Sequence, residues 1–299
     1  MSAPDALVSG LVVVDKPAGY TSHDVVGRMR GIASTRKVGH SGTLDPMATG
    51  VMVLGINRAT RLLGYLTLVD KEYLATIRLG QTTVTDDAEG DLLIEVPAPA
   101  VERSAIEAAV LPLTGEIAQV PSAVSAIKVD GVRSYARVRA GEEVALRSRA
   151  VTVSTFEIIG VRSGAGDHGT NTDVDVRVVC SSGTYVRALA RDLGAALGVG
   201  GHLTMLRRTR VGGFGLDLAH TLEDLEQELS IVDLDTAARE SFNTYALTAE
   251  QATDVRFGRV LTAIDLGSPG PVALFDPLGA FLALYEQRGR TARAVSVFV

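Results

Sequence analysis

The side chain best placed to do chemistry in this sequence is the carboxylate of Asp45. It lies in a glycine-rich stretch, residues 39–50, directly before the apolar run Val51–Leu54. Glycines bend such a loop and Pro46 stiffens it, so the loop can hold an acidic group in one orientation at the mouth of a strand. An aspartate before a proline also commonly starts an ordinary turn. The pattern therefore indicates either a mounted catalytic carboxylate or a simple turn residue.

Strands and helices must position this loop, and the sequence predicts several of them. Residues 10–15 form an apolar, β-branched run typical of a buried strand, and Ser22 can cap the helix that follows the next turn. Residues 71–80 alternate as a half-buried strand with Tyr73 on its inner face. The other predicted elements are a helix at 101–113, strands at about 151–161 and 172–180, a helix capped by Thr184, and a helix at 222–229.

Composition limits the class of protein. The chain has 299 residues, 46% of them apolar, but no apolar run approaches the roughly 18 residues that span a bilayer. The start of the chain shows no basic segment followed by an apolar one, so we expect no secretory signal and a soluble, cytoplasmic protein. A single cysteine, Cys180, excludes an internal disulfide and fits a reducing compartment. With one Cys and five His, a Cys/His metal site is not expected.

Charge is distributed unevenly along the chain. Residues 1–220 carry 23 Lys+Arg and 23 Asp+Glu, whereas residues 221–299 carry 6 and 12, which accounts for the net charge of −6. Basic side chains outnumber acidic ones in the windows 16–61, 121–150 and 177–210. A phosphate backbone requires clustered positive charge and not a basic whole protein, so nucleic-acid binding is compatible with this composition.

Residues 39–50 read Gly-His-Ser-Gly-Thr-Leu-Asp-Pro-Met-Ala-Thr-Gly and resemble motif II of the pseudouridine synthases, in the form of the TruB family. The resemblance implies that Asp45 is the catalytic nucleophile. The turn containing Lys16 and Pro17 is similar to motif I, which supports the active-site loop structurally, as Gly42 does within the loop. The resemblance covers roughly residues 10–220.

A second motif supports this resemblance. Gly-Thr-Tyr-Val-Arg at residues 183–187 resembles motif III, whose arginine pairs with the nucleophile, so Arg187 inherits that role. The pairing has a physical reason, because an enclosed carboxylate tends to gain a proton and a guanidinium partner keeps it ionised. The same resemblance makes Tyr73 a catalytic residue that reaches Asp45. The side chains that it assigns to the target uridine are His40, Tyr73, Tyr185 and Leu206.

RNA-backbone contacts are expected from the basic windows. The segment 119–131 is extended and ends in a turn, and the helix predicted to follow it presents Arg133, Tyr135, Arg137 and Arg139. Val124 occupies a place where TruB-like chains often have tyrosine, which weakens stacking there. The polar, acidic segment 81–90 could be mistaken for a cation site, but the resemblance implies a surface loop without metal. The residues predicted to contact phosphates are Lys128, Arg133, Arg137, Arg207 and Arg208.

The resemblance implies an α+β pseudouridine synthase fold, with a mixed, mostly antiparallel central sheet flanked by helices and loops around a catalytic cleft. From about residue 232 the chain is acidic and shows short predicted strands at 271–275, 281–285 and 294–298. We therefore predict a catalytic domain at 1–231 and a small PUA-like β domain at 232–299, of a kind that binds RNA.

The activity implied is isomerisation of the T-loop uridine at position 55 of tRNA. The target nucleotide has to be extruded from its stack. The sequence does not decide whether Asp45 attacks C6, attacks C1′ or abstracts a sugar proton. Isomerisation is redox-neutral, so no cofactor is expected, and we expect a monomer that recognises the T-arm stem-loop without an obligatory protein partner.

Two alternatives remain open at this point. One is a non-catalytic RNA-binding protein or tRNA folding chaperone, although binding alone would not require Asp45, Tyr73 and Arg187 together. The other is a dyskerin-like, guide-RNA-dependent enzyme that acts on ribosomal RNA. The short amino-terminal segment and the small carboxy-terminal module favour stand-alone action.

Overall fold

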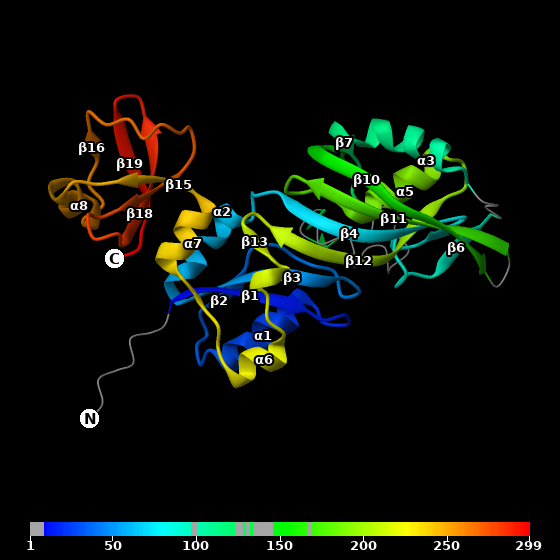
Figure 1. The fold of residues 1–299 in the computed structure, drawn as a ribbon, viewed down its shortest axis with the longest axis horizontal. Helices are drawn as coiled ribbons and strands as arrows, with labels where there is room; N and C mark the ends of the chain where they lie inside the picture. The colour runs from blue at the N-terminus through cyan, green and yellow to red at the C-terminus, as the bar shows by residue number, and fades with distance from the viewer. Residues whose placement is uncertain (1–8, 97–100, 123–127, 130–131, 134–145, 167–168) are drawn as a thin grey trace.

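Two β-sheets organise the chain in the computed structural model, which describes residues 9–96, 101–122, 128–129, 132–133, 146–166 and 169–299 (Figure 1). The first sheet has ten strands, and all of its pairs are antiparallel except β3 with β12. This confirms the predicted mixed, mostly antiparallel sheet. In spatial order its main path is β14 (Val232–Asp233), β1 (Gly10–Lys16), β3 (Thr49–Ile56), β12 (Gly201–Val211), β4 (Lys71–Leu79), β11 (Gly169–Cys180), β10 (Arg149–Gly166) and β7 (Gly115–Gln119), with β2 (Val38–His40) on β3 and β13 (Phe214–Gly215) on β12.

The second sheet is formed by the carboxy-terminal part of the chain. Its strands are β15 (Asn243–Ala246), β17 (Val272–Phe275), β18 (Phe281–Arg288), β19 (Thr291–Val297) and β16 (Leu261–Thr262), in that order. A separate carboxy-terminal β domain is therefore confirmed. Because β14 still pairs with β1, the change from one sheet to the other falls between Asp233 and Asn243, and the domain boundary after residue 231 stays a prediction. Two hairpins are separate: β5 (Gln81–Thr83) with β6 (Leu92–Glu95), and β8 (Lys128–Val129) with β9 (Val132–Arg133).

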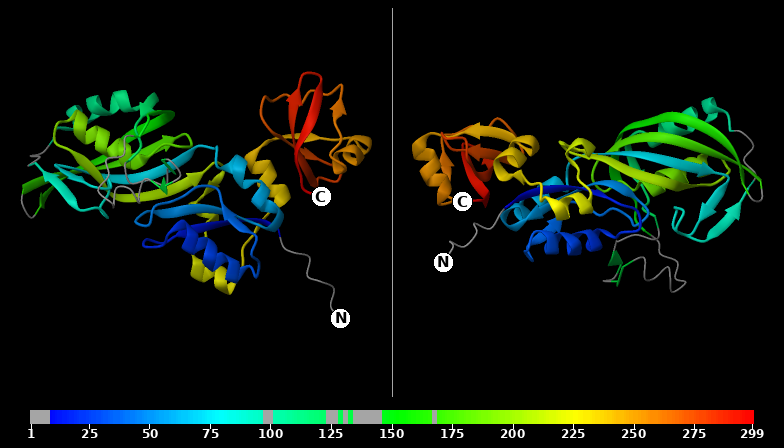
Figure 2. Two further views of the ribbon diagram at one scale, coloured as in Figure 1. Left: turned by 180° about the vertical axis from the view of Figure 1, so that it is seen from behind. Right: turned by 60° about the horizontal axis from the view of Figure 1, so that its bottom comes forward.

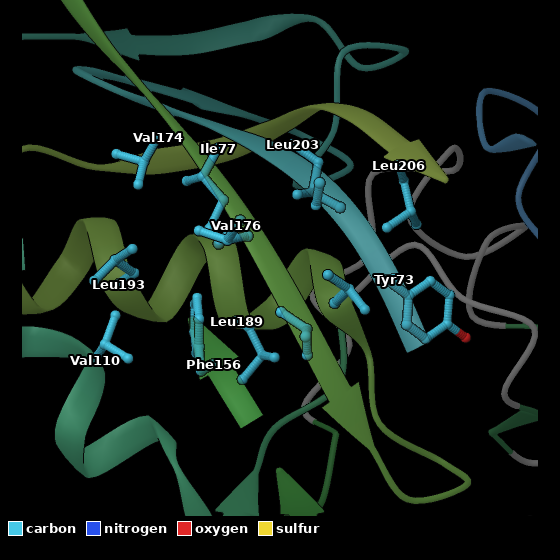
Figure 3. Close-up of a cluster of buried hydrophobic side chains, with 14 of the residues drawn as sticks. Tyr73, Ile77, Val110, Phe156, Val174, Val176, Leu189, Leu193, Leu203 and Leu206 are labelled. Carbon is cyan, nitrogen blue, oxygen red and sulfur yellow. The ribbon is translucent and has the colours of Figure 1, made fainter. Parts of the chain in front are cut away.

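Helices cover the sheets and close their hydrophobic cores. Helices α3 and α5 pack with β4, β10, β11 and β12 around one core, whose edge reaches Tyr73 and Leu206 (Figure 3). A different core lies between α1, α6 and the strands β1 and β3. The helices are α1 (Ser22–Ile32), α2 (Leu63–Leu66), α3 (Arg103–Val110), α5 (Val186–Ala196), α6 (Leu222–Gln227), α7 (Leu234–Ser241) and α8 (Ala249–Arg256), with 3-10 turns η1 (Asn57–Arg61), η2 (Leu111–Leu113) and η3 (Leu216–Leu218).

The second sheet is joined to the first by a shared core. Leu11 and Val13 of β1 belong to the same buried cluster as Phe275, Phe281 and Phe298 of the carboxy-terminal region. In Figures 1 and 2 the carboxy-terminal sheet lies at one end of the molecule, and β7 and α3 lie at the other. The joint between the sheets is therefore a packed interface.

Three local predictions were wrong. Thr21, and not Ser22, caps α1, because Thr21 Oγ1 accepts from the Asp24 amide while Ser22 bonds to the active-site loop. Thr184 does not cap α5, since its hydroxyl donates to the Ser181 carbonyl and Tyr185 is the cap residue. The backbone of Arg133 is in strand β9 and not in a helix.

Candidate active site

A cavity of about 260 Å³ opens where three distant parts of the chain meet. The loop between β2 and β3 forms one wall, the segment between β11 and α5 forms another, and the adjacent strands β4 and β12 form the rest. Seven of the predicted site residues line this cavity, although up to 166 positions separate them in the chain. They are Gly42, Asp45, Tyr73, Tyr185, Arg187, Leu206 and Arg208.

The carboxylate of Asp45 forms a two-point ion pair with Arg187. The Arg187 Nε lies 3.0 Å from Asp45 Oδ2, and Nη2 lies 3.3 Å from Oδ1. Only 7% of the Arg187 side chain is exposed, against 33% of that of Asp45. The guanidinium is thus fixed within the protein and fixes the carboxylate in turn, while Asp45 keeps one face open to the cavity.

Arg187 is itself anchored on its other side by the acidic segment 81–90. Its Nη1 donates to the Thr85 carbonyl at 2.9 Å and lies 3.5 Å from Asp87 Oδ2. The Asp87 side chain is buried, and it is fixed by hydrogen bonds from the Thr85 hydroxyl and the Glu89 amide. The prediction of a plain surface loop is wrong, because this segment packs against the motif III arginine. Periodicity could not reveal this, since the segment is polar throughout.

Motif I holds the Asp45 loop by means of a buried amine. Lys16 Nζ donates to the carbonyls of Pro17, Tyr20 and Pro46 at 2.7–3.1 Å, and so connects the first turn to the loop. Burial lowers the pKa of Lys16 to about 8, partly opposed by the charge of Asp45. From the other side, Ser22 Oγ donates to the Leu44 carbonyl and accepts from the Leu44 amide.

Arg208 supports the same loop from beneath and does not face solvent. Its guanidinium donates to the Val51 carbonyl at 2.7 Å and to those of Thr43 and Gly42 at 3.3 Å, and 2% of the residue is exposed. The prediction of an RNA-backbone contact is wrong for Arg208, because its donors are turned inward. The side chain of Arg207 points to the opposite face of β12, where it is partly exposed and paired with Asp15 at 2.7 Å. A phosphate contact by Arg207 stays a prediction.

Gly50 shows why this arrangement needs glycine. It follows the loop in β3 and pairs with Arg208 in the one parallel step of the first sheet. Its φ of +102° lies in a region that side chains disfavour, and a Cβ atom there would stand 2.1 Å from the Arg208 carbonyl oxygen. The close approach of the two backbones brings the Arg208 side chain under the loop.

The wall of the cavity formed by β4 and β12 combines aromatic, apolar and cationic side chains. Tyr73 and Leu206 are buried, and burial raises the pKa of the Tyr73 phenol, opposed mainly by the Arg208 charge. Lys71 also lines the cavity, and its Nζ donates to the carbonyls of Thr67 and Val69 at 2.9 and 2.7 Å. Burial and the Arg208 charge lower the pKa of Lys71 to about 8.

Sequence reasoning missed two residues that hold Tyr185. The buried side-chain amide of Gln119 forms two hydrogen bonds with the Tyr185 backbone. Its Oε1 accepts from the Tyr185 amide at 2.8 Å, and its Nε2 donates to the Tyr185 carbonyl at 3.0 Å. The guanidinium of Arg149 lies 5.4 Å from the centre of the Tyr185 ring, within cation–π range. The signal for Gln119 was a polar residue ending the alternating strand β7.

Other predicted residues lie outside the cavity. His40 is half-buried, its Nδ1 accepts from the Gly42 amide at 3.2 Å, and burial lowers its pKa. His40 therefore supports the loop, and its contact with RNA stays a prediction. Arg137 is outside the described residues, and for Lys128 and Arg133 only the backbone is described. Pro17 lies in motif I, where its carbonyl accepts from Lys16, whereas Gly42 lines the cavity and its carbonyl accepts from Arg208.

Two further features concern the part of the chain that the structure describes. No group of three or more His, Cys, Asp or Glu side chains in that part of the chain could hold a metal ion. None of the helices described is long and apolar enough to cross a membrane.

Comparison with solved structures identifies the class of fold. A chain of the Cbf5–Nop10–Gar1 complex aligns with a TM-score of 0.74 and 27% identity, over 97% of this chain and 85% of the other. A chain of the H/ACA RNP bound to a substrate RNA containing 2′-deoxyuridine aligns with a TM-score of 0.73 and 25% identity, over the same fractions. The fold is that of the pseudouridine synthases.

Sequence comparison gives the family. The model "TruB family pseudouridylate synthase (N terminal domain)" matches residues 30–186, and two carboxy-terminal models of tRNA pseudouridine synthases match 187–250 and 242–299. The chain is 57% identical to tRNA pseudouridine synthase B of Streptomyces griseus over 97% of each chain, and 57% identical to that of Arthrobacter sp. over 98% of this chain and 97% of the relative. The chain belongs to the TruB family of pseudouridylate synthases.

Proposed function

We propose that this chain isomerises the T-loop uridine at position 55 of tRNA to pseudouridine, with Asp45 as the residue that acts on the flipped nucleotide. Its activity as a tRNA pseudouridine synthase, an isomerase, follows from the family. The observation that supports the role of Asp45 is its ion pair with the buried Arg187 in the wall of a cavity. A carboxylate oriented by two contacts and open on one face suits attack on an extruded base or sugar.

The reaction exchanges one bond to the sugar for another. The bond between C1′ and N1 breaks, a bond between C1′ and C5 forms, the hydrogen on C5 leaves as a proton, and N1 gains a proton. Atoms and electrons balance without an oxidant or a reductant. Attack by Asp45 at C6, attack at C1′ and abstraction of a sugar proton all remain compatible with the geometry, and Tyr73, Tyr185 and Leu206 line the space in which the uracil turns.

Similarity favours stand-alone action on tRNA over guide-dependent action. The tRNA pseudouridine synthase B relatives match at 57% identity along almost the entire chain, against 25–27% for chains from the H/ACA and Cbf5 complexes. We infer a monomer that recognises the T-arm stem-loop in the cytoplasm without an obligatory protein partner. We also infer catalysis by residues 1–231 and RNA binding by residues 232–299.

The test uses a T-arm stem-loop RNA tritiated at uridine C5. Tritium release and RNA binding are measured for the wild type and for Asp45→Asn, which preserves the shape of the side chain but removes its charge. Release by the wild type alone, with similar binding by both proteins, supports the proposal. Binding without release by either protein favours the chaperone function, and release by both removes Asp45 from the mechanism.

A further inference from the structure

A second hollow, which we call the joint site, lies where the two sheets meet. It has a volume of about 590 Å³ and shares no lining residue with the active-site cavity. Its wall combines three cationic side chains with polar ones, and none of the lining side chains is acidic. The lining residues are Ser9, Lys37, Asn57, Arg58, Thr60, Arg61 and Val299.

Among the described residues, the three cations of the joint site form no ion pair with an acidic side chain. Arg58 Nη1 donates to the Phe298 carbonyl at 2.9 Å, and Arg61 Nη1 donates to the Val297 carbonyl at 2.6 Å. Both arginines and Lys37 are exposed. A guanidinium has five N–H donors, so each arginine retains donors for an anion.

The backbone holds these cations in one place. The Asn57 amide donates to the Lys37 carbonyl at 2.8 Å, so the segment that carries Lys37 is fixed to the one that carries Arg58. Asn57 has a φ of +53°, a left-handed conformation in which asparagine is several-fold enriched, and its side chain accepts from the Thr35 hydroxyl at 2.9 Å. The joint site is thus formed by a defined turn and not by free side chains.

We propose that the joint site binds backbone phosphates of the tRNA outside the T arm, an inference that rests on the proposed function. Strand β3 runs from Thr49, at the active-site loop, to Ile56, beside the joint site. Seven steps at about 3.3 Å separate these ends by roughly 23 Å. That is too far for the flipped uridine, but a duplex with one charge per about 1.7 Å carries many phosphates over such a length. The cations lie within residues 37–61, and no acidic side chain of residues 221–299 lines the joint site.

The test is the salt dependence of binding by Lys37→Ala, using unmodified full-length tRNA and an isolated T-arm stem-loop. Lys37 is chosen because Arg58 and Arg61 also hold the carboxy-terminal strand. Loss of one phosphate contact reduces the slope of log K against log salt by about 0.9. At 0.1 M salt, one tenth of the 1 M reference, this corresponds to roughly eightfold weaker binding. We expect Lys37→Ala to lose that amount for full-length tRNA and nothing for the stem-loop, and Lys37→Arg to restore it.

Arg36→Ala is the matched control, because Arg36 is exposed and adjacent in sequence but does not line the joint site. Equal effects of Arg36→Ala and Lys37→Ala would overturn the proposal, since they would reflect net charge alone. An unchanged slope, or equal losses for both RNAs, would also overturn it. Tritium release from the stem-loop is measured in parallel, and its absence in the wild type would refute the proposed function and not the joint site.

Discussion

Gln119→Ala tests whether the position of Tyr185 depends on a side chain distant from the reacting atoms. The substitution removes two hydrogen bonds, of 2.8 and 3.0 Å, to the backbone of Tyr185. The bond to the Tyr185 carbonyl is worth about 1 kcal/mol, because that carbonyl still accepts from the Leu189 amide at 3.2 Å, whereas the Tyr185 amide left without Gln119 costs about 1–3 kcal/mol. We therefore expect the unfolding free energy to fall by about 2–4 kcal/mol.

The effect on catalysis should exceed what lost stability explains. A displacement of about 1 Å in a group that positions the substrate can cost on the order of a hundredfold in rate. We expect single-turnover tritium release by Gln119→Ala to slow by about 10- to 100-fold while the Kd for the T-arm stem-loop changes little. Gln119→Glu keeps the acceptor for the Tyr185 amide but places an oxygen against the Tyr185 carbonyl, so it should restore little activity.

Gln287 provides the matched control. Its side-chain amide also forms hydrogen bonds with the backbone, since it accepts from the Leu266 amide at 2.9 Å and donates to the Ile264 carbonyl at 2.9 Å. Gln287 lies in strand β18 of the carboxy-terminal sheet. Gln287→Ala should lower the melting temperature to a similar degree without slowing tritium release. The reasoning is refuted if Gln119→Ala is destabilised like Gln287→Ala and keeps its rate within twofold.

Three further predictions concern Arg187, Arg208 and Lys16, which hold the Asp45 loop. Arg187→Lys should slow tritium release at least 100-fold, because a point charge cannot make the two-point pair with Asp45, whereas RNA binding measured by filter retention should persist. Arg208→Ala should cost about 3 kcal/mol or more in urea unfolding, since it leaves buried carbonyls unpaired, while Arg207→Ala should cost under about 1 kcal/mol. For Lys16 the folded pKa of about 8 lies below the usual 10.5, so the unfolded chain binds more protons between these values. The unfolding free energy of the wild type should therefore rise relative to Lys16→Met from pH 8 to 10, and a fall would contradict the burial argument.

The sequence predicted what depends on local pattern. The alternation of residues 71–80 corresponds to β4, and the apolar run at 10–15 corresponds to β1. Both could be predicted because the pattern of a strand depends only on neighbouring residues. The motifs also predicted that Asp45, Tyr73, Tyr185, Arg187 and Leu206 belong to one site, and all five line one cavity. Their roles in catalysis and substrate binding remain predictions that the experiments above address.

What the sequence could not predict depends on contacts between distant segments. Nothing local distinguishes Arg208 from Arg207, yet the pleat of β12 turns one inward under the loop and the other outward toward Asp15. By residue type Ser22 is the better helix cap, but its hydroxyl is bonded to Leu44, which lies 22 positions away, and Thr21 caps the helix. The burial of Asp87 similarly follows from Arg187, 100 positions later in the chain.

The charge balance of the cavity suits every route that remains open to Asp45. Attack at C6 leaves negative charge on the pyrimidine ring, and attack at C1′ or abstraction of a sugar proton releases uracil with the electron pair of the broken C1′–N1 bond. Lys71, Arg187 and Arg208 line the cavity, and Asp45 is the one acidic side chain among its lining residues. Fixed cations in a partly desolvated site stabilise developing negative charge without reorganising. This arrangement favours an anionic pyrimidine whichever bond forms first, and so the route has to be decided by trapping the intermediate and not by the electrostatics of the site.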